Sequence, residues 1–450
     1  MKYEANPEGK QASRSISERI GGELEAFVEP ILVDLDQRID KRLVRTFLLT
    51  LQVIVQFRNR SQGLLLSELG GYILPPDQAP AGTKRLSNLL RCRKWSYGLI
   101  ERFLWARAEA ELKAMEAQEE TALLAWDESV VEKSESIAIE GLCAVRSSKA
   151  RRLKRIKPGY FNPPGGRPVF VPGMHWVTLL LTSRNWKPCV VAMQWWTTRG
   201  KFASDRRTEE AALLKRCAQA WGRRVLHIWD RGFSGGPWLA QASAYRVRFV
   251  LRWQKGYKLI DNQERNRKAW EITRGKRSWE HRQVWDARRR CWRKTGIVAV
   301  PISHLEYQGQ LYLVVSRPGK GRSPWYLVTN EPILSADDAW RIVFAYARRW
   351  QVEMTYRYAK SELAMESPRL WSWHNRLKLL LMVTLVYAFL LSLLSPEHAP
   401  LLHWLFRYWC HRTGKRHRNV SMPLYRLRAA LSRLWLSYPP PPMSLFENVG

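Results

Sequence analysis

The order of apolar segments over residues 121–253 constrains the fold of this chain more than any other feature. The pattern predicts three strands, a helix, a strand, a helix and a fifth strand. The first strand, Leu123–Asp127, and the fourth, Val225–Asp230, each end in an aspartate. This succession predicts a mixed α/β sheet, in which ligands gather where strand ends meet. We therefore expect Asp127 and Asp230 to contribute to one site.

A second stretch, residues 254–334, interrupts this pattern. It begins with a very basic segment rich in tryptophan and continues with three strand patterns, which predict a β-rich insertion. The element order before the insertion is that of a ribonuclease-H-like fold. The chain after the insertion, Ile342–Lys360, contains no Gly or Pro and predicts one continuous helix.

Four side chains of that helix form a pattern. Tyr346, Arg349, Glu353 and Lys360 are spaced three, four and seven residues apart. At 3.6 residues per turn they fall within roughly a 60° arc of one face. A carboxylate is a natural Mg²⁺ ligand, and Arg, Lys and Tyr are natural phosphate contacts. The alternative is a solvated helix face held by salt bridges, and the strip alone does not decide between the two.

The chain is long enough for several domains. The N-terminal part predicts only helices, and its helix Thr83–Arg93 carries Lys84, Arg85, Arg91 and Arg93, as in a DNA-binding helix-turn-helix module. A basic surface helix unconnected with DNA is the alternative. We expect a helical DNA-binding domain (1–115), a ribonuclease-H-like catalytic core in two parts (116–253 and 335–396), a β-rich insertion (254–334) and a basic C-terminal region (397–450).

Charge and cysteine usage limit the class of protein. The net charge is +34, from 74 Lys and Arg against 40 Asp and Glu, which points to a polyanion such as nucleic acid as the partner. Six scattered Cys with no Cys-x-x-Cys pair argue against a zinc ribbon and suit a reducing cytosol. No phosphate-binding Gly-rich loop with a Lys is present, so we expect no use of ATP.

One apolar segment resembles a membrane span. Leu379–Leu394 has 16 residues, which is shorter than the roughly 20 that a bilayer requires. We therefore expect a buried core helix and no membrane partner.

Three acids stand out as candidate catalytic residues: Asp127, Asp230 and Glu353. Carboxylates that converge repel each other unless a cation is present. Two Mg²⁺ ions roughly 4 Å apart would relieve this repulsion and activate a water or a 3′-hydroxyl for attack on a phosphodiester. Each acid has an ordinary alternative: Asp127 as a turn residue with Glu128 as the ligand, Asp230 as a cap, and Glu353 as an ion-pair partner on its own helix.

At these residues the chain resembles the DDE transposases of bacterial insertion sequences that carry a β-strand insertion. Their signature Tyr-x2-Arg-x3-Glu-x6-Lys is matched by Tyr346, Arg349, Glu353 and Lys360 without a departure. The segment that begins at Asp230, Asp-Arg-Gly-Phe, is similar to the second motif of the family, and Asp127 in Ala-Trp-Asp-Glu is similar to the first. The resemblance covers about residues 121–365.

The resemblance implies a transposase that binds the terminal inverted repeats of a mobile element. It would act as an endonuclease and join the 3′-ends to target DNA. Asp127, Asp230 and Glu353 would hold two Mg²⁺ ions, with Mn²⁺ as an alternative, and Tyr346, Arg349 and Lys360 would contact the DNA backbone. An exposed tryptophan of the insertion would stack on a flipped base; the candidates are Trp270, Trp279, Trp285 and Trp292.

The expected partners are double-stranded DNA, at the transposon ends and the target, and a second copy of the chain in a synaptic homodimer. The expected location is the bacterial cytoplasm, at the nucleoid. Two alternatives remain open on the sequence: a protein of the same descent that only binds DNA, and a nuclease of the same fold that never joins a 3′-end to a target.

Overall fold

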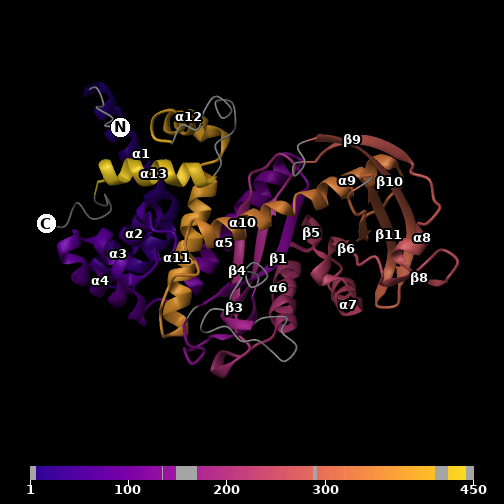
Figure 1. Cartoon of the computed structure of the whole chain (residues 1–450), viewed down its shortest axis with the longest axis horizontal. Helices are drawn as coiled ribbons and strands as arrows, with labels where there is room; N and C mark the ends of the chain where they lie inside the picture. The colour runs from indigo at the N-terminus through magenta and orange to yellow at the C-terminus, as the bar shows by residue number, and fades with distance from the viewer. Residues whose placement is uncertain are drawn as a thin grey trace.

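The computed structural model describes residues 7–133, 135–147, 170–286, 291–319, 321–410 and 424–441. The basic C-terminal region predicted at 397–450 therefore lies partly outside the described residues. Figure 1 shows an elongated molecule with helices at one end, a sheet through the middle and a mainly β part at the other end.

Helices make up the N-terminal part. In chain order they are α1 (Pro7–Asp36), α2 (Lys41–Gln56), α3 (Leu66–Ile73), α4 (Ala79–Arg91) and α5 (Gly98–Ala117), with a single 3₁₀ turn, η1 (Pro76–Gln78), before α4. Asp40 caps α2 by accepting a hydrogen bond from the Arg42 N–H. α3 and α4 cross closely: a Cβ added at Gly82 would clash with the carbonyl oxygen of Gly70, at 2.2 Å. Two glycines thus allow the backbones of these helices to touch.

The central strands follow the predicted order, with one additional strand, β2 (Cys143–Arg146), between the first two predicted ones. They are β1 (Ala122–Glu132), β2 (Cys143–Arg146), β3 (Phe170–Thr182), β4 (Cys189–Trp196), β5 (Val225–Trp229) and β6 (Arg248–Arg252), with α6 (Arg206–Trp221) before β5 and α7 (Gly236–Ala244) after it. β1 lies between β3, which is antiparallel to it, and β5, which is parallel. β4 pairs antiparallel with β3, and β6 pairs parallel with β5. The fold is therefore mixed α/β, as predicted.

The expectation that the first strand ends at Asp127 is wrong. β1 continues to Glu132, and its second half pairs with β3 from Glu128↔Val177 to Glu132↔Gly173. Asp127 therefore lies within a strand. Asp230, in contrast, directly follows the last residue of β5, as predicted.

The stretch predicted to be β-rich contains strands and one short helix. They are β7 (Lys258–Ile260), β8 (Asn266–Lys268), α8 (Ala269–Ile272), β9 (Glu280–Asp286), β10 (Cys291–His304), β11 (Tyr307–Arg317) and β12 (Trp325–Thr329). β12 pairs with β6, so within the described residues these strands extend the central sheet. The division of the chain into domains stays a prediction.

The predicted helix Ile342–Lys360 is two helices, α9 (Ala336–Ala347) and α10 (Trp350–Ser361). α9 begins at a capping box, in which Ser335 and Asp338 satisfy each other's backbone N–H groups. Between the helices, Arg349 N–H donates to Tyr346 C=O and Val352 N–H donates to Arg349 C=O, which is the tighter 3₁₀ pattern. Tyr346 is only 3% exposed. The four side chains thus do not form one strip on a continuous helix.

The C-terminal helices pack onto the N-terminal ones. They are α11 (Trp373–Ser392), α12 (Ala399–Tyr408) and α13 (Leu424–Ser437). α11 is long and apolar enough to cross a membrane by length and composition, but 89% of its apolar window is buried inside the protein, as in a core helix. Lys378 on α11 donates to the carbonyls of Leu90 and Cys92, at 3.0 and 2.7 Å. This buried amine supplies hydrogen bonds to the carbonyl end of α4.

Candidate active site

Asp127 lies in β1, and Asp230 directly follows the neighbouring strand β5. β1 and β5 pair in parallel, with Ala125 opposite Ile228. Two residues further along each chain are the two aspartates. Because side chains alternate along a strand, Asp127 shares the face of Ala125, whose core also includes residues of α9 and α10. The charge of Asp230 acts on the Asp127 carboxyl group, so the two acids lie near each other, and their role in one site stays a prediction.

Arg349 joins the first and third acids. One of its terminal nitrogens lies 3.1 Å from Asp127 Oδ2, and the other pairs with Glu353 Oε1. The side chains of Arg349 and Asp127 are 12% and 15% exposed, whereas that of Glu353 is 56% exposed. A single guanidinium in the bend between α9 and α10 therefore bridges a shielded carboxylate and an open one.

The pKa of Asp127 is raised to about 7 by the balance of burial and neighbouring charges. Burial is the main cause of the rise, and the charges of Asp230 and Glu353 add to it. Arg349 and the backbone N–H of Glu128 act in the opposite direction. Around neutral pH Asp127 is thus poised between its protonated and ionised forms, and an added cation would favour the ionised form.

The donor chemistry at this face fits a hard divalent cation. Three carboxylates are the oxygen ligands that Mg²⁺ and Mn²⁺ accept, and the Arg349 guanidinium already places a positive charge between two of them. Over the described ranges, however, no group of three His, Cys, Asp or Glu residues is close enough to hold a metal ion as it stands. The Asp230 carboxylate instead accepts a hydrogen bond from Gly232 N–H at 2.6 Å. The acids thus do not form a closed cage.

The remaining signature residues, Lys360 and Tyr346, make different contacts. Lys360 Nζ donates to Ser129 Oγ at 2.8 Å, and Ser129 lies two residues beyond Asp127 on the same face of β1. Tyr346 is buried, its ring contacts Trp325 edge to face at 5.1 Å, and burial raises its pKa. Roles for Tyr346, Arg349 and Lys360 in DNA contact stay predictions.

Glu128, the alternative ligand, lies on the other face of β1. Its carboxylate pairs with Arg206 at 2.7 Å, and Arg206 also pairs with Glu210 at 3.0 Å. Arg206 further donates to the Gly232 carbonyl at 3.2 Å, in the turn after Asp230. Burial, followed by the charge of Glu210, raises the pKa of Glu128 to about 8. Sequence reasoning missed Arg206 and Glu210, because an Arg and a Glu four residues apart are a common surface pair.

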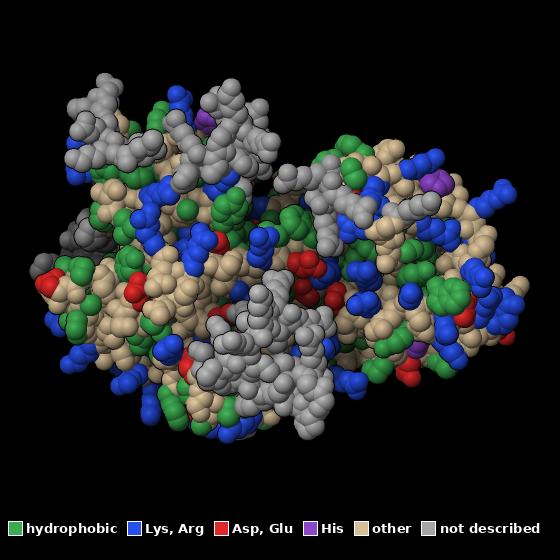
Figure 2. Space-filling model, in the orientation of Figure 1, with side chains coloured by type: hydrophobic (Ala, Val, Ile, Leu, Met, Phe, Trp, Pro, Cys, Tyr) green, Lys and Arg blue, Asp and Glu red, His purple; other side chains and the backbone are tan. Residues whose placement is uncertain are grey.

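Figure 2 shows acidic side chains gathered in a hollow near the middle of one face, with Lys and Arg side chains around it. Figure 1 places α10, β1 and β5 in this part of the molecule. A cationic rim around an acidic centre suits a polyanion whose backbone is held at the rim while metal ions neutralise the centre.

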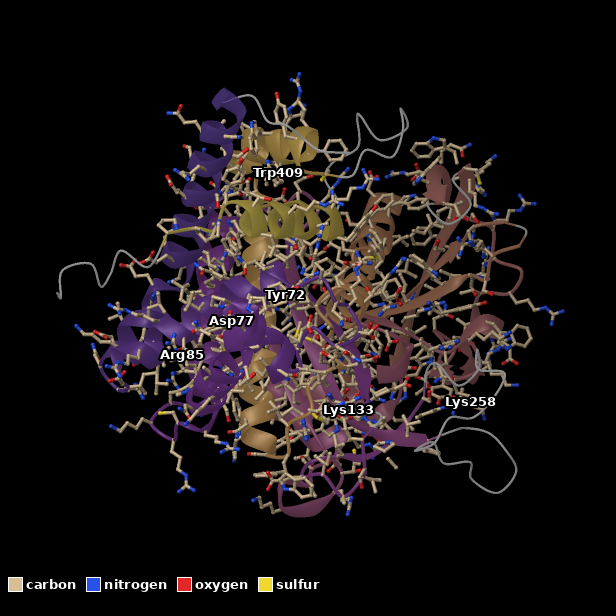
Figure 3. All side chains as sticks on the ribbon, turned by 60° about the vertical axis from the view of Figure 1, so that its left-hand side comes forward. Tyr72, Asp77, Arg85, Lys133, Lys258 and Trp409 are labelled. Atoms are coloured by element: carbon tan, nitrogen blue, oxygen red, sulfur yellow. The ribbon has the colours of Figure 1, made fainter. Side chains whose placement is uncertain are left out.

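Two further features suit contact with nucleic acid. On α4, Lys84, Arg85 and Arg91 are exposed while Leu86 and Leu90 are buried. Figure 3 shows Arg85 on the helical side of the molecule, far from Lys258 in the β-rich part. In that β-rich part, three of the four candidate tryptophans are exposed by roughly half or more: Trp279 (49%), Trp285 (48%) and Trp292 (66%). Trp285 and Trp292 face each other across β9 and β10, with ring centres 5.5 Å apart.

No family model matches the sequence, and no curated protein matches it. Among solved structures, the chain is similar to a piggyBac transposase in a synaptic complex with hairpin DNA. The likeness has a TM-score of 0.40 and 12% sequence identity, and covers 95% of this chain and 80% of the other. So distant a likeness identifies neither the fold family nor the function of this chain, and both depend on the residues described above.

Proposed function

We propose that the protein is a DDE-type transposase of the bacterial insertion-sequence kind. It would bind the terminal inverted repeats of a mobile element, cleave the DNA and join the 3′-ends to target DNA. One observation carries the proposal: Arg349 pairs with both Asp127 and Glu353, and the charge of Asp230 acts on Asp127 and Arg349, although the three acids are far apart in the sequence. The order β4-β3-β1-β5-β6, antiparallel up to β1 and parallel beyond it, supports a ribonuclease-H-like core.

Asp127, Asp230 and Glu353 would hold Mg²⁺, or Mn²⁺ in its place. Bound there, the ions supply activation of a water or a 3′-hydroxyl and stabilisation of the leaving oxygen. Arg349 lies at the acids and would meet a scissile phosphate, while Lys360, which donates to Ser129 two residues along β1 from Asp127, would hold the DNA backbone beside it. Arg206 fixes the turn after Asp230 from the opposite face.

The DNA would extend from this face over both ends of the molecule. The net charge of +34 supports electrostatic attraction to the duplex, and the exposed cations of α4 support a contact with transposon ends. The exposed pair Trp285 and Trp292 supports stacking on an unpaired base. The proposal includes a homodimer on paired ends and a bacterial cytoplasmic location, without ATP or a membrane.

The test is cleavage and strand transfer with the DNA that flanks the gene, in Mg²⁺. We expect Asp230→Asn to lower the cleavage rate by about 10²-fold or more, since a metal site contributes several kcal/mol of charge stabilisation. Asp205→Asn is the matched control: Asp205 is an exposed cap of α6, and Asn caps a helix equally well.

Three results would contradict the proposal in different ways. Full cleavage by Asp230→Asn would remove the acid site from the chemistry. Salt-sensitive binding with no metal-dependent cutting in the wild type would instead favour a protein that only binds DNA. Cutting without transfer of a 3′-end would favour a nuclease of the same fold.

A further inference from the structure

Tyr356 on α10 connects the helix of the third acid to the strand of the first. Its hydroxyl donates a hydrogen bond to the backbone carbonyl of Asp127 and accepts one from Thr178 N–H at 3.2 Å. Asp127 and Thr178 are directly opposite each other on the antiparallel strands β1 and β3. The tyrosine thus binds both strands at the residue that carries the first carboxylate.

The ring of Tyr356 is held as firmly as its hydroxyl. It stacks on Trp176 of β3, with ring centres 5.3 Å apart and planes 22° apart. Trp176 is completely buried and Tyr356 is 7% exposed. A buried, stacked and doubly hydrogen-bonded side chain has one accessible rotamer, so α10 cannot slide along β1 without breaking these contacts.

Tyr356 lies three residues after Glu353, so the two side chains leave nearly the same side of α10. Fixing Tyr356 to the backbone of Asp127 therefore also fixes the distance from Glu353 to Asp127. The two carboxylates repel each other, and catalytic groups must be held to within about 0.5 Å of their working geometry. We propose that Tyr356 is a positioning residue that sets the separation of Asp127 and Glu353 for metal binding; this inference rests on the proposed function.

The contrast with Arg349 explains why a neutral group is needed. Arg349 now offsets the charges of Asp127 and Glu353, but a metal ion or a phosphate at the same place would compete for its ion pairs. The two hydrogen bonds of the Tyr356 hydroxyl described above go to backbone groups, of Asp127 and Thr178, so they persist when the carboxylates change partners. Burial raises its pKa well above the ordinary value, which keeps it uncharged throughout the working range of pH.

Any buried tyrosine needs a hydrogen-bond partner, and the choice of partner distinguishes Tyr356 from its neighbours. Tyr358 on the same helix donates to the carbonyl of Leu424, at 3.4 Å, at the start of α13. Tyr387 on α11 bonds to Thr355 at 2.8 Å. Both are as buried as Tyr356, but neither of these bonds reaches β1. Tyr358 is therefore a matched control on the same helix.

The experiment compares Tyr356→Phe with Tyr358→Phe in the full chain. The Phe variant keeps the ring on Trp176 and removes only the hydroxyl. We expect the Mg²⁺ concentration that half-saturates the protein (the Mg²⁺ midpoint) to rise about 10-fold or more in Tyr356→Phe, as for residues that orient metal ligands. Calorimetric titration with the metal alone measures it. The cleavage rate should fall by about 10–100-fold. DNA affinity should be unchanged, and Tyr358→Phe should stay within about 3-fold of the wild type on all three measurements.

Equal Mg²⁺ midpoints for the two variants would overturn the inference. If Tyr356→Phe does not fold, 4-aminophenylalanine at position 356 replaces it, because its amine can still donate to the Asp127 carbonyl; a midpoint near that of the wild type supports positioning, and a lost midpoint contradicts it. A wild type that neither binds Mg²⁺ nor cuts DNA removes the proposed function itself. A wild type that does both, with an unaffected Tyr356→Phe, removes only this inference.

Discussion

Two groups of one arginine and two acids lie on either side of β1. On one face Arg349 bridges Asp127 and Glu353, and on the other Arg206 bridges Glu128 and Glu210. In each group the arginine and the second acid are four residues apart on or beside one helix. They differ in access: the Glu353 side chain is 56% exposed, and that of Glu210 is 4% exposed. The second acid is thus open to solvent in the Arg349 group (the front group) and buried in the Arg206 group (the rear group).

The rear group supports the front one. Arg206 also binds the Gly232 carbonyl in the turn that carries Asp230, while its partner Glu128 is the neighbour of Asp127. The rear arginine therefore ties together the segments of the first two acids from behind. We expect changes in the front group to affect chemistry, and changes in the rear group to affect stability.

The largest expected difference concerns the two glutamates. Glu353→Gln should lower metal-dependent cleavage by about 10²-fold or more, since it removes a charged ligand, yet spare DNA binding. Glu210→Gln keeps an oxygen that accepts a hydrogen bond from Arg206 and should leave the cleavage rate within about 3-fold of the wild type. Single-turnover cleavage of an end oligonucleotide measures both. Equal losses would show that the rear group also takes part in the chemistry.

The two arginines should differ in how Mg²⁺ affects their variants. Without metal, Arg349→Ala leaves two close carboxylates uncompensated and should cost about 2 kcal/mol, or a few °C in Tm. Arg206→Ala should cost about 1–2 kcal/mol, less than a fully buried pair, because the Arg206 side chain is 40% exposed.

Thermal unfolding with and without Mg²⁺ separates the two variants. The metal can replace the charge of Arg349 and should restore the Tm of Arg349→Ala, since a ligand that binds only the folded state stabilises it. It should not restore the Tm of Arg206→Ala. Recovery of both variants, or of neither, would mean that the two faces do not differ in metal access.

The sequence was a good guide where a signal is local. An apolar strand followed at once by Asp230 located the second acid, because the pattern of a buried strand stops at its last residue. Asp127 was expected at the end of a strand, but it lies within β1. The run Asp127–Ser129 is polar, and pairing with β3 overrides this low strand propensity. The mixed α/β class follows from element order and needs no tertiary detail.

Other features depend on contacts between distant segments. Nothing between Tyr346 and Trp350 signals a break, since neither Gly nor Pro occurs there; the bend becomes understandable once Arg349 is seen bound to Asp127 on another element. The link from Tyr356 to β1 is equally invisible, because a tyrosine on an amphipathic helix predicts only burial. The pairing of Arg206 on α6 with Glu128 on β1 likewise depends on the fold and has no signal in the sequence.

The smallest expected effect is a difference in pH dependence. Burial, followed by the charge of Glu210, raises the pKa of Glu128 from its ordinary value of 4.5 to about 8, and burial also raises the pKa of Glu210. Between pH 4.5 and 8 the folded protein therefore holds more protons than the unfolded chain. The contribution of this pair to stability is complete below pH 4.5 and is lost as the pH rises through 8.

Glu210→Gln removes one of these acids and the charge that raises the other. We expect the fall in Tm between pH 5 and pH 8 to be smaller in this variant than in the wild type, by about 1–2 °C.

The front face behaves differently, because the pKa of Asp127, about 7 without metal, should fall when Mg²⁺ is added. In the plot of Tm against pH, Mg²⁺ should thus reduce the change that is due to Asp127, as Asp127→Asn should also do. It should leave the change that is due to Glu210. Identical profiles for Glu210→Gln and the wild type would show that the rear carboxylates are ionised in the folded protein, and that burial does not separate the two groups.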